Sequence, residues 1–182
     1  MTAMPIALFM RNNMNRTFFT TKEIVITGVM AATLEAAKIS LSFLPNVELV
    51  TLLLILYTLF FGWKTLVSVF AFVGVECAVW GVGLWTVMYL YIWPLLVLLT
   101  LLLRRKKSVW VFAVLSALFG LFFGALCALP YLFIGGVSMA FTWWIAGIPY
   151  DMLHCVSNFI LCLVLFRPLQ SVLERIGREI DR

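Results

Sequence analysis

Long apolar stretches, separated by short polar breaks, dominate this chain. A helix needs about 20 mainly apolar residues to cross the hydrocarbon core of a bilayer. Six stretches approach that length, at roughly 24–43, 47–62, 65–83, 86–103, 109–133 and 144–166. The pattern predicts an all-α membrane protein, built as a bundle of six transmembrane helices.

The breaks between these stretches predict how the chain is organised. We expect a cytoplasmic N-terminal tail at 1–21, a six-helix transmembrane domain at 22–166 and a charged amphipathic tail at 167–182. Pro130 is expected to kink or end the fifth helix, because proline removes a hydrogen-bond donor and clashes with the preceding turn. Three connections that are poor in charge are expected as loops, near 43–47, 83–86 and 134–143.

Basic residues are distributed very unevenly among the connections. Twelve of the 13 Lys and Arg residues lie before the first stretch, after the last, or in the alternate connections at 64 and 104–107. The loops near 43–47, 83–86 and 134–143 contain none. Basic loops stay in the cytoplasm during insertion, so both termini are expected on the cytoplasmic side of a cell membrane that the chain crosses several times.

Composition agrees with this assignment. Hydrophobic residues make up 64% of the chain and charged residues 12%, whereas a soluble domain is nearer half apolar and a quarter charged. The net charge of +5 is spread over short loops and tails, so it indicates topology and does not favour nucleic-acid binding. The four cysteines lie in apolar stretches and are expected as free, buried thiols.

Ionisable side chains inside the predicted spans gather toward the outer side. An ionised side chain at mid-bilayer costs roughly 2.5–3.5 kcal/mol on insertion scales, so these groups must pair or line a wet cavity. Asp151, His154 and Asn158 are spaced i, i+3, i+7 and share one helix face. Glu35 and Lys38 are spaced to form an ion pair within one helix. Their common position favours an outward-facing ligand cavity over purely structural hydrogen bonding.

Aromatic side chains accompany this polar set. Tryptophan and tyrosine prefer the membrane interface in any membrane protein, but flat rings beside convergent polar groups also suit a bulky vitamin-like ligand. We therefore expect the glycine-bearing outer loops to close over a cavity, and the ligand to be neutral or weakly charged. The predicted substrate-binding residues are Lys38, Asn46, Glu48, Glu76, Trp80, Trp85, Tyr131, Trp144, Asp151, His154 and Asn158.

Two stripes of small residues recur every four positions. Gly28, Ala32 and Ala36 form one stripe in the first span, and residues 116, 120 and 124 form another in the fifth. Such stripes allow close approach of helix backbones, either inside the bundle or against another subunit. We predict that the first stripe is a partner interface, because Gly28 and Ala32 lie in the cytoplasmic half of their span.

Motifs for chemistry are scarce. The chain has no Walker A sequence, no His-Glu-x-x-His zinc site and no Gly-x-Ser-x-Gly nucleophile elbow. We therefore expect no enzyme activity, no resident metal and no intrinsic cofactor. Two other classes stay open: an intramembrane metal-dependent enzyme that uses Asp151, His154, Glu76 or Glu48, and a scaffold protein without a ligand.

Three strings resemble one family, the S components of energy-coupling factor (ECF) transporters, which are vitamin-binding membrane subunits. The strings are the Gly28, Ala32 and Ala36 stripe, LPNVELV at 44–50, and GIPYDMLH at 147–154, which continues to Asn158 and ends in RPL at 167–169. The resemblance covers about residues 22–170. The last two strings are the more specific ones. The stripe is degenerate and has Gly where the family pattern has Ala.

The resemblance implies a binding subunit without its own power source. The first stripe would contact the transmembrane coupling subunit (T component), and two separate ATPase subunits would drive uptake. The ligand, held by outer-half residues and loops, would be a vitamin. The chain looks most similar to the cobalamin-type members. The alternatives are another vitamin or precursor, among them riboflavin, pantothenate, pyridoxine and queuosine.

Overall fold

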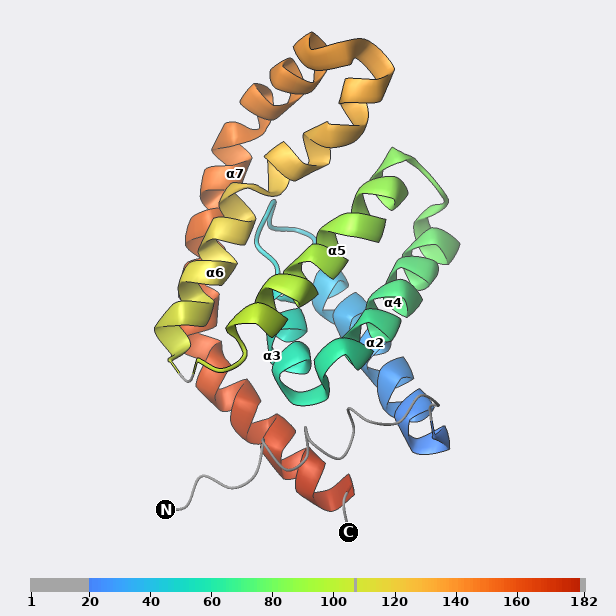
Figure 1. Cartoon of the computed structure of the whole chain (residues 1–182), viewed down its shortest axis with the longest axis vertical. Coiled ribbons are helices and arrows are strands. Elements are labelled where there is room, and N and C mark those ends of the chain that lie inside the picture. The colour runs from blue at the N-terminus through green and yellow to red at the C-terminus, as the bar shows by residue number, and fades with distance from the viewer. Residues whose placement is uncertain (1–19, 107, 181–182) are drawn as a thin grey trace.

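The computed structural model describes residues 20–106 and 108–180 of the 182-residue chain (Figure 1). Within this part every regular element is a helix, which confirms the all-α prediction. The elements are α2 (Thr21–Ser40), α3 (Val50–Phe61), the short 3-10 helix η1 (Gly62–Lys64), α4 (Thr65–Trp80), α5 (Leu84–Leu103), α6 (Val109–Leu121) and α7 (Phe123–Ile180). The predicted tail at 1–21 lies almost wholly outside the described residues.

Local signals explain where several helices begin and end. α2 starts at a capping box, in which Thr20 and Glu23 satisfy each other's backbone N–H groups. α3 and α4 both end at glycines with positive φ, Gly62 at 63° and Gly81 at 81°. These conformations are strained for residues with a Cβ atom, so the glycines permit the sharp reversals that follow.

The reversal near the end of the chain differs from the sequence prediction. α7 continues through Pro130, and its backbone leaves helical geometry only at Gly135 and Gly136, the latter with φ 73°. The helix therefore consists of a first arm, 123–134, and a second arm, 137–180, which fold into a hairpin (Figure 1). The reversal falls within the loop expected near 134–143, but the break in the helix is shorter than expected, because only this glycine pair leaves helical geometry. The second arm includes the predicted amphipathic tail up to Ile180.

The short helix α3 occupies the centre of the bundle. Nine of its 12 residues are buried, and it packs against α2, α4, α5, α6 and α7. Its burial on all sides fits its composition, which is apolar apart from Thr51, Tyr57 and Thr58. The core that surrounds it is a single cluster of aliphatic and aromatic side chains drawn from every helix.

Three continuous helical stretches of the described chain are long and apolar enough to cross a membrane: Val50–Trp80, Leu84–Leu103 and Val109–Arg178. The first contains α3, η1 and α4, and the last contains α6 and both arms of α7. The prediction of long membrane-compatible helices is therefore supported. The count of six spans is not established by these stretches and stays a prediction.

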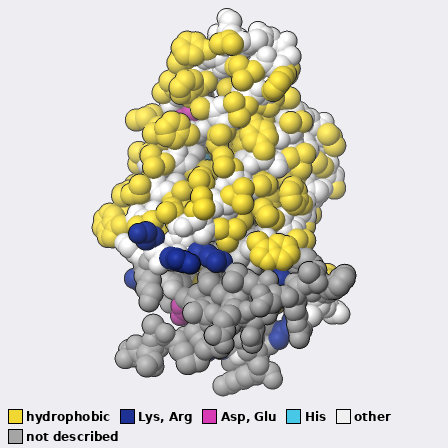
Figure 2. Space-filling view, in the orientation of Figure 1, with side chains coloured by type: hydrophobic (Ala, Val, Ile, Leu, Met, Phe, Trp, Pro, Cys, Tyr) yellow, Lys and Arg dark blue, Asp and Glu magenta, His cyan; other side chains and the backbone are white. Residues whose placement is uncertain are grey.

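The two ends of the molecule differ in charge. The ends of the described chain lie together, and the η1 turn and the α5–α6 connection lie with them (Figure 1). Figure 2 shows Lys and Arg side chains at this basic end and a largely hydrophobic surface above it. Lys64 of η1 forms an ion pair with Glu23 there, which joins the α3–α4 turn to the start of α2.

Candidate functional site: a polar-lined cavity away from the basic end

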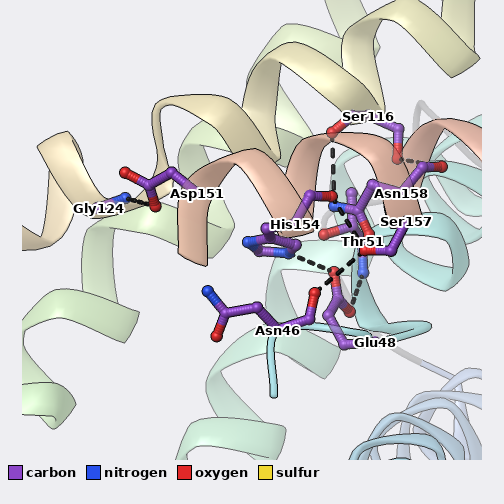
Figure 3. Close-up of polar contacts among 9 residues, drawn as sticks. All are labelled: Asn46, Glu48, Thr51, Ser116, Gly124, Asp151, His154, Ser157 and Asn158. Atoms are coloured by element: carbon purple, nitrogen blue, oxygen red, sulfur yellow. Dashed lines mark hydrogen bonds and ion pairs between the residues drawn. The ribbon is translucent and has the colours of Figure 1, made fainter. Parts of the chain in front are cut away.

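Asp151, His154 and Asn158 lie on one buried face of the second arm of α7, as their spacing predicts (Figure 3). The three side chains contact different neighbours. Asp151 Oδ1 accepts a hydrogen bond of 2.9 Å from the Gly124 backbone N–H in the first arm. Asn158 Nδ2 donates to the Ser116 carbonyl of α6, at 3.4 Å. Asp151 and Asn158 therefore fasten the second arm to α6 and the first arm.

His154 connects the same face to the centre of the bundle. Its Nε2 atom lies 3.1 Å from Glu48 Oε1. The other oxygen of Glu48 accepts a hydrogen bond of 2.8 Å from the Thr51 backbone N–H, and so caps the first turn of α3. The two bonds place Glu48 between α3 and α7, although the two residues that it joins are far apart in the chain.

The connection between α2 and α3 is docked on the same arm. Ser157 Oγ donates to the Asn46 carbonyl at 3.1 Å. Asn46 is the only residue other than glycine with positive φ in the described chain, at 55°, a conformation that asparagine tolerates better than most residues. The LPNVELV string therefore forms a fixed connection that presents Asn46 and Glu48 to α7 (Figure 3).

A cavity of about 640 Å³ lies among these elements. Its wall is formed by the end of α2, the α2–α3 connection, the middle of α5 and both arms of α7. Five predicted binding residues line it: Lys38, Asn46, Glu48, Asp151 and His154. Two buried atoms in this wall, Asp151 Oδ2 and His154 Nδ1, have no hydrogen-bond partner within the described chain. Asp151 and His154 therefore give the cavity wall two polar side chains whose hydrogen-bonding capacity is not fully used within the described chain.

The remaining predicted binding residues do not line the cavity. Trp80 is 63% exposed at the end of α4, and the Trp85 ring packs on Tyr89 with centroids 5.4 Å apart. Tyr131 stacks on Trp143 at 5.1 Å. Trp144, Glu76 and Asn158 are also absent from the lining. Their proposed contact with a ligand therefore has no support from the cavity.

Sequence reasoning missed most of the aromatic wall, which consists of Tyr89, Trp93, Phe123, Trp143 and Tyr150. Tyr89 and Trp93 lie inside the apolar helix α5, where no polar neighbour in sequence distinguishes a cavity residue from a core or lipid-facing one. Only Trp143 and Tyr150 could have been suspected from the sequence as cavity residues, because they are adjacent to the predicted site residues Trp144 and Asp151.

A second polar cluster lies between α2 and α4. Lys38 forms an ion pair with Glu76 of α4, so the predicted partner, Glu35 of the same helix, is not the one that its ammonium group contacts. Both Glu35 oxygens and Glu76 Oε1 are buried and have no hydrogen-bond donor among the described residues. Lys38 also lines the cavity, and so connects this cluster to it.

The two small-residue stripes face different surroundings. Gly28, Ala32 and Ala36 are all exposed on α2. By contrast, a Cβ atom added to Gly120 would lie 2.8 Å from the His154 carbonyl, and one added to Gly124 would lie 2.3 Å from Asp151 Oδ2. The second arm of α7 therefore packs on the second stripe, whereas the first stripe is left exposed by residues 20–106 and 108–180.

The described residues contain no group of three or more His, Cys, Asp or Glu side chains arranged to hold a metal ion. The four cysteines are free. No family model, no curated protein and no solved structure matches this chain. The function therefore has to be inferred from the cavity and its surroundings.

Proposed function

We propose that this chain is the substrate-binding S component of an ECF-type importer in a prokaryotic cell membrane, and that it captures a vitamin-sized ligand in the polar-lined cavity. The observation that carries the proposal is the convergence on one cavity of Glu48, Asp151 and His154. They come from the two sequence strings that resemble the family most specifically. Buried polar groups of this kind mark ligand pathways in membrane proteins.

The proposed topology has six passes. They are α2, α3, α4, α5, α6 together with the first arm of α7, and the second arm of α7. α3 alone is only about 18 Å long at 1.5 Å per residue, so the residues that precede it and η1 would complete its pass. Basic residues near the ends of the described chain, in η1 and in the α5–α6 connection support a cytoplasmic location for that end.

The proposed partner surface is the exposed stripe of Gly28, Ala32 and Ala36. A smooth stripe lets a second helix approach closely in a membrane, where close packing replaces the hydrophobic effect as a driving force. Its partner would be the T component, and two separate ATPase subunits would supply the energy. The chain itself would then need no nucleotide site.

The size of the cavity bears on the identity of the ligand. Its volume of about 640 Å³ lies within the 300–1,000 Å³ that is typical of sites for drug-sized molecules. Cobalamin, the vitamin that the resemblance favours, is much larger, so only part of it would enter. Riboflavin, pantothenate, pyridoxine and queuosine are of a size that the cavity can enclose, and the volume favours this smaller class.

A pair of neighbouring tryptophans provides the test. Trp143 lines the cavity, whereas Trp144 does not, so Trp144→Ala is a matched control for Trp143→Ala. The purified chain would be analysed by native mass spectrometry for a retained small molecule, and the affinity for that molecule would then be measured. We expect Trp143→Ala to weaken binding at least tenfold, because the variant lacks the indole ring that lines the cavity. A tenfold change corresponds to about 1.4 kcal/mol of binding free energy.

Under this proposal Trp144→Ala leaves the affinity unchanged. Equal losses for both variants would place the ligand outside this cavity. A chain that retains no small molecule, and binds none of the named vitamins, would favour a scaffold role. Metal-dependent turnover that His154→Ala abolishes would favour an intramembrane enzyme.

A further inference from the structure

Two buried carboxyl groups, Glu35 on α2 and Glu76 on α4, lie beside the cavity wall. Lys38, one helical turn after Glu35, pairs with Glu76, so both carboxyl groups lie around the same ammonium group. Their residues are only 8% and 1% exposed. Two ionised carboxylates so close together in a buried site disfavour each other's charge, and a proton on one of the two groups removes this repulsion.

The contacts of Lys38 indicate which group carries that proton. Its ammonium group pairs with Glu76 Oε2, which favours the ionised form of Glu76. Glu35 has no hydrogen-bond donor at either oxygen, and Glu76 Oε1 also lacks one. A single proton on one Glu35 oxygen, donated to Glu76 Oε1, gives a partner to two of these three atoms.

Charge counting leads to the same arrangement. With both carboxylates ionised, the cluster of Glu35, Glu76 and Lys38 carries one net negative charge. With one proton it is neutral, which removes the cost of burying an uncompensated charge away from water. Apart from Lys38, the nearby titratable groups are Tyr89 of α5, whose ring lies 5.5 Å from the Lys38 ammonium, and Cys77 of α4, which contacts Thr86. Neither is a cation, so neither can take the place of the proton.

We propose that Glu35 and Glu76 form a proton-binding site, in which one shared proton keeps the cluster neutral and sets the charge that Lys38 presents to the cavity. Loss of the proton to water would leave a second carboxylate beside Lys38 and strengthen its hold on that ammonium group. The effect on ligand binding rests on the proposed function, because Lys38 lines the same cavity. The proton site itself does not.

The test measures the carboxylic acid directly. Infrared difference spectroscopy of the full chain in lipid nanodiscs would record the C=O stretch of protonated carboxyl groups, and its shift in heavy water, across a pH titration. Glu35→Gln retains the shape of the side chain, and its amide can donate to Glu76 Oε1 in place of the proton. We expect this variant to lose one carboxylic acid band that the native chain shows near neutral pH.

Two further variants and a control complete the design. Glu76→Gln leaves Glu35 as the only carboxylate beside Lys38, so Glu35 should ionise and the same band should disappear. Lys38→Met removes the counter-ion and should increase the intensity of the carboxylic acid signal. Glu174→Gln, in the part of α7 near the basic end, where Glu174 bonds Gln170, should leave the band unchanged.

The proposal is overturned if the folded Glu35→Gln and Glu76→Gln proteins keep the full native band. Thermal unfolding in the same nanodiscs identifies a variant that does not fold. The other variant alone then tests the proposal, because both variants should lose the same band. If the proposed importer function is wrong, the band is still expected, because the infrared measurement needs no ligand. If the chain retains a ligand but shows no such band, the proton site is disproved and the proposed importer function is not affected.

Discussion

The two small-residue stripes have the same spacing and opposite surroundings. Gly28, Ala32 and Ala36 leave a smooth surface exposed on α2. Ser116, Gly120 and Gly124 are buried against the second arm of α7, where Gly120 lies against the His154 backbone. One stripe therefore builds the cavity by bringing Asp151 and His154 close to α6 and the first arm of α7, and the other is left exposed. A small-xxx-small pattern indicates close approach but does not show what approaches.

The largest effect on the isolated chain is expected for Gly124→Ala. The added Cβ would lie 2.3 Å from Asp151 Oδ2, so the carboxylate has to leave its bond to the residue-124 N–H. Overpacking and a lost buried hydrogen bond should together destabilise the fold by about 2–4 kcal/mol, measured as loss of thermal stability in detergent. Gly147→Ala is the matched control, because Gly147 also lines the cavity but has open space at its Cβ position.

Equal stability of the two alanine variants would mean that the first arm of α7 is not held against Asp151. Such a result would also weaken the assignment of the cavity, because the position of Asp151 depends on this contact.

Gly120→Ala should have an intermediate effect. Its Cβ would approach the carbonyl carbon and oxygen of His154 to 2.8 Å, a smaller overlap than the one at Gly124, and no buried hydrogen bond is lost. Separation of the two helices should cost about 1–3 kcal/mol and should move His154 relative to Glu48. Gly74→Ala, on an exposed face of α4 with open space around it, should instead stabilise the chain by roughly 0.5–1 kcal/mol.

A cysteine pair would show whether the helices separate. Crosslinking between the native Cys155 and a cysteine introduced at position 117 should change in Gly120→Ala and stay unchanged in Gly74→Ala, with the other three native cysteines replaced by alanine. Unchanged crosslinking and stability in Gly120→Ala would contradict the tight packing of the second stripe.

Ala32→Trp should have the smallest effect on the isolated chain, within about 0.5 kcal/mol, as is usual for exposed positions. The bulky ring should nevertheless prevent close approach of a partner helix, so co-purification with the T component and ATPase subunits should be lost while ligand binding is kept. Val164→Trp, on an exposed face of the second arm of α7, is the control. Normal assembly of the Ala32→Trp protein would show that the first stripe is not the interface with the partner subunit.

Periodic features could be read from the sequence because they depend on local geometry alone. The spacing of Asp151, His154 and Asn158 placed them on one buried face, since residues three and four apart are neighbours on any helix. Features that depend on distant segments could not be read in this way. Lys38 lies three residues after Glu35, yet its ammonium group is held by Glu76 of another helix.

The reversal after α6 shows a second limit. Pro130 was expected to kink or end its helix, but the residues around it are apolar and the helix continues through it to Gly135. Neighbouring helices can compensate the hydrogen bond that a proline removes in a membrane protein. Within α7, Gly136 combines a positive φ with open space at its Cβ position, so the chain turns where the backbone has no Cβ atom to restrict it.

Composition and the distribution of Lys and Arg by themselves determined the helical class of this protein and the basic end, because both arise from local hydrophobicity and charge. Tertiary structure decided the rest: which stripe is buried, which carboxylate pairs with Lys38, and that Tyr89 and Trp93 of α5 face the cavity. The physical reason is that nearly every side chain of an apolar helix is suited equally to core, lipid or cavity. Only the packing of the neighbouring helices distinguishes these surroundings.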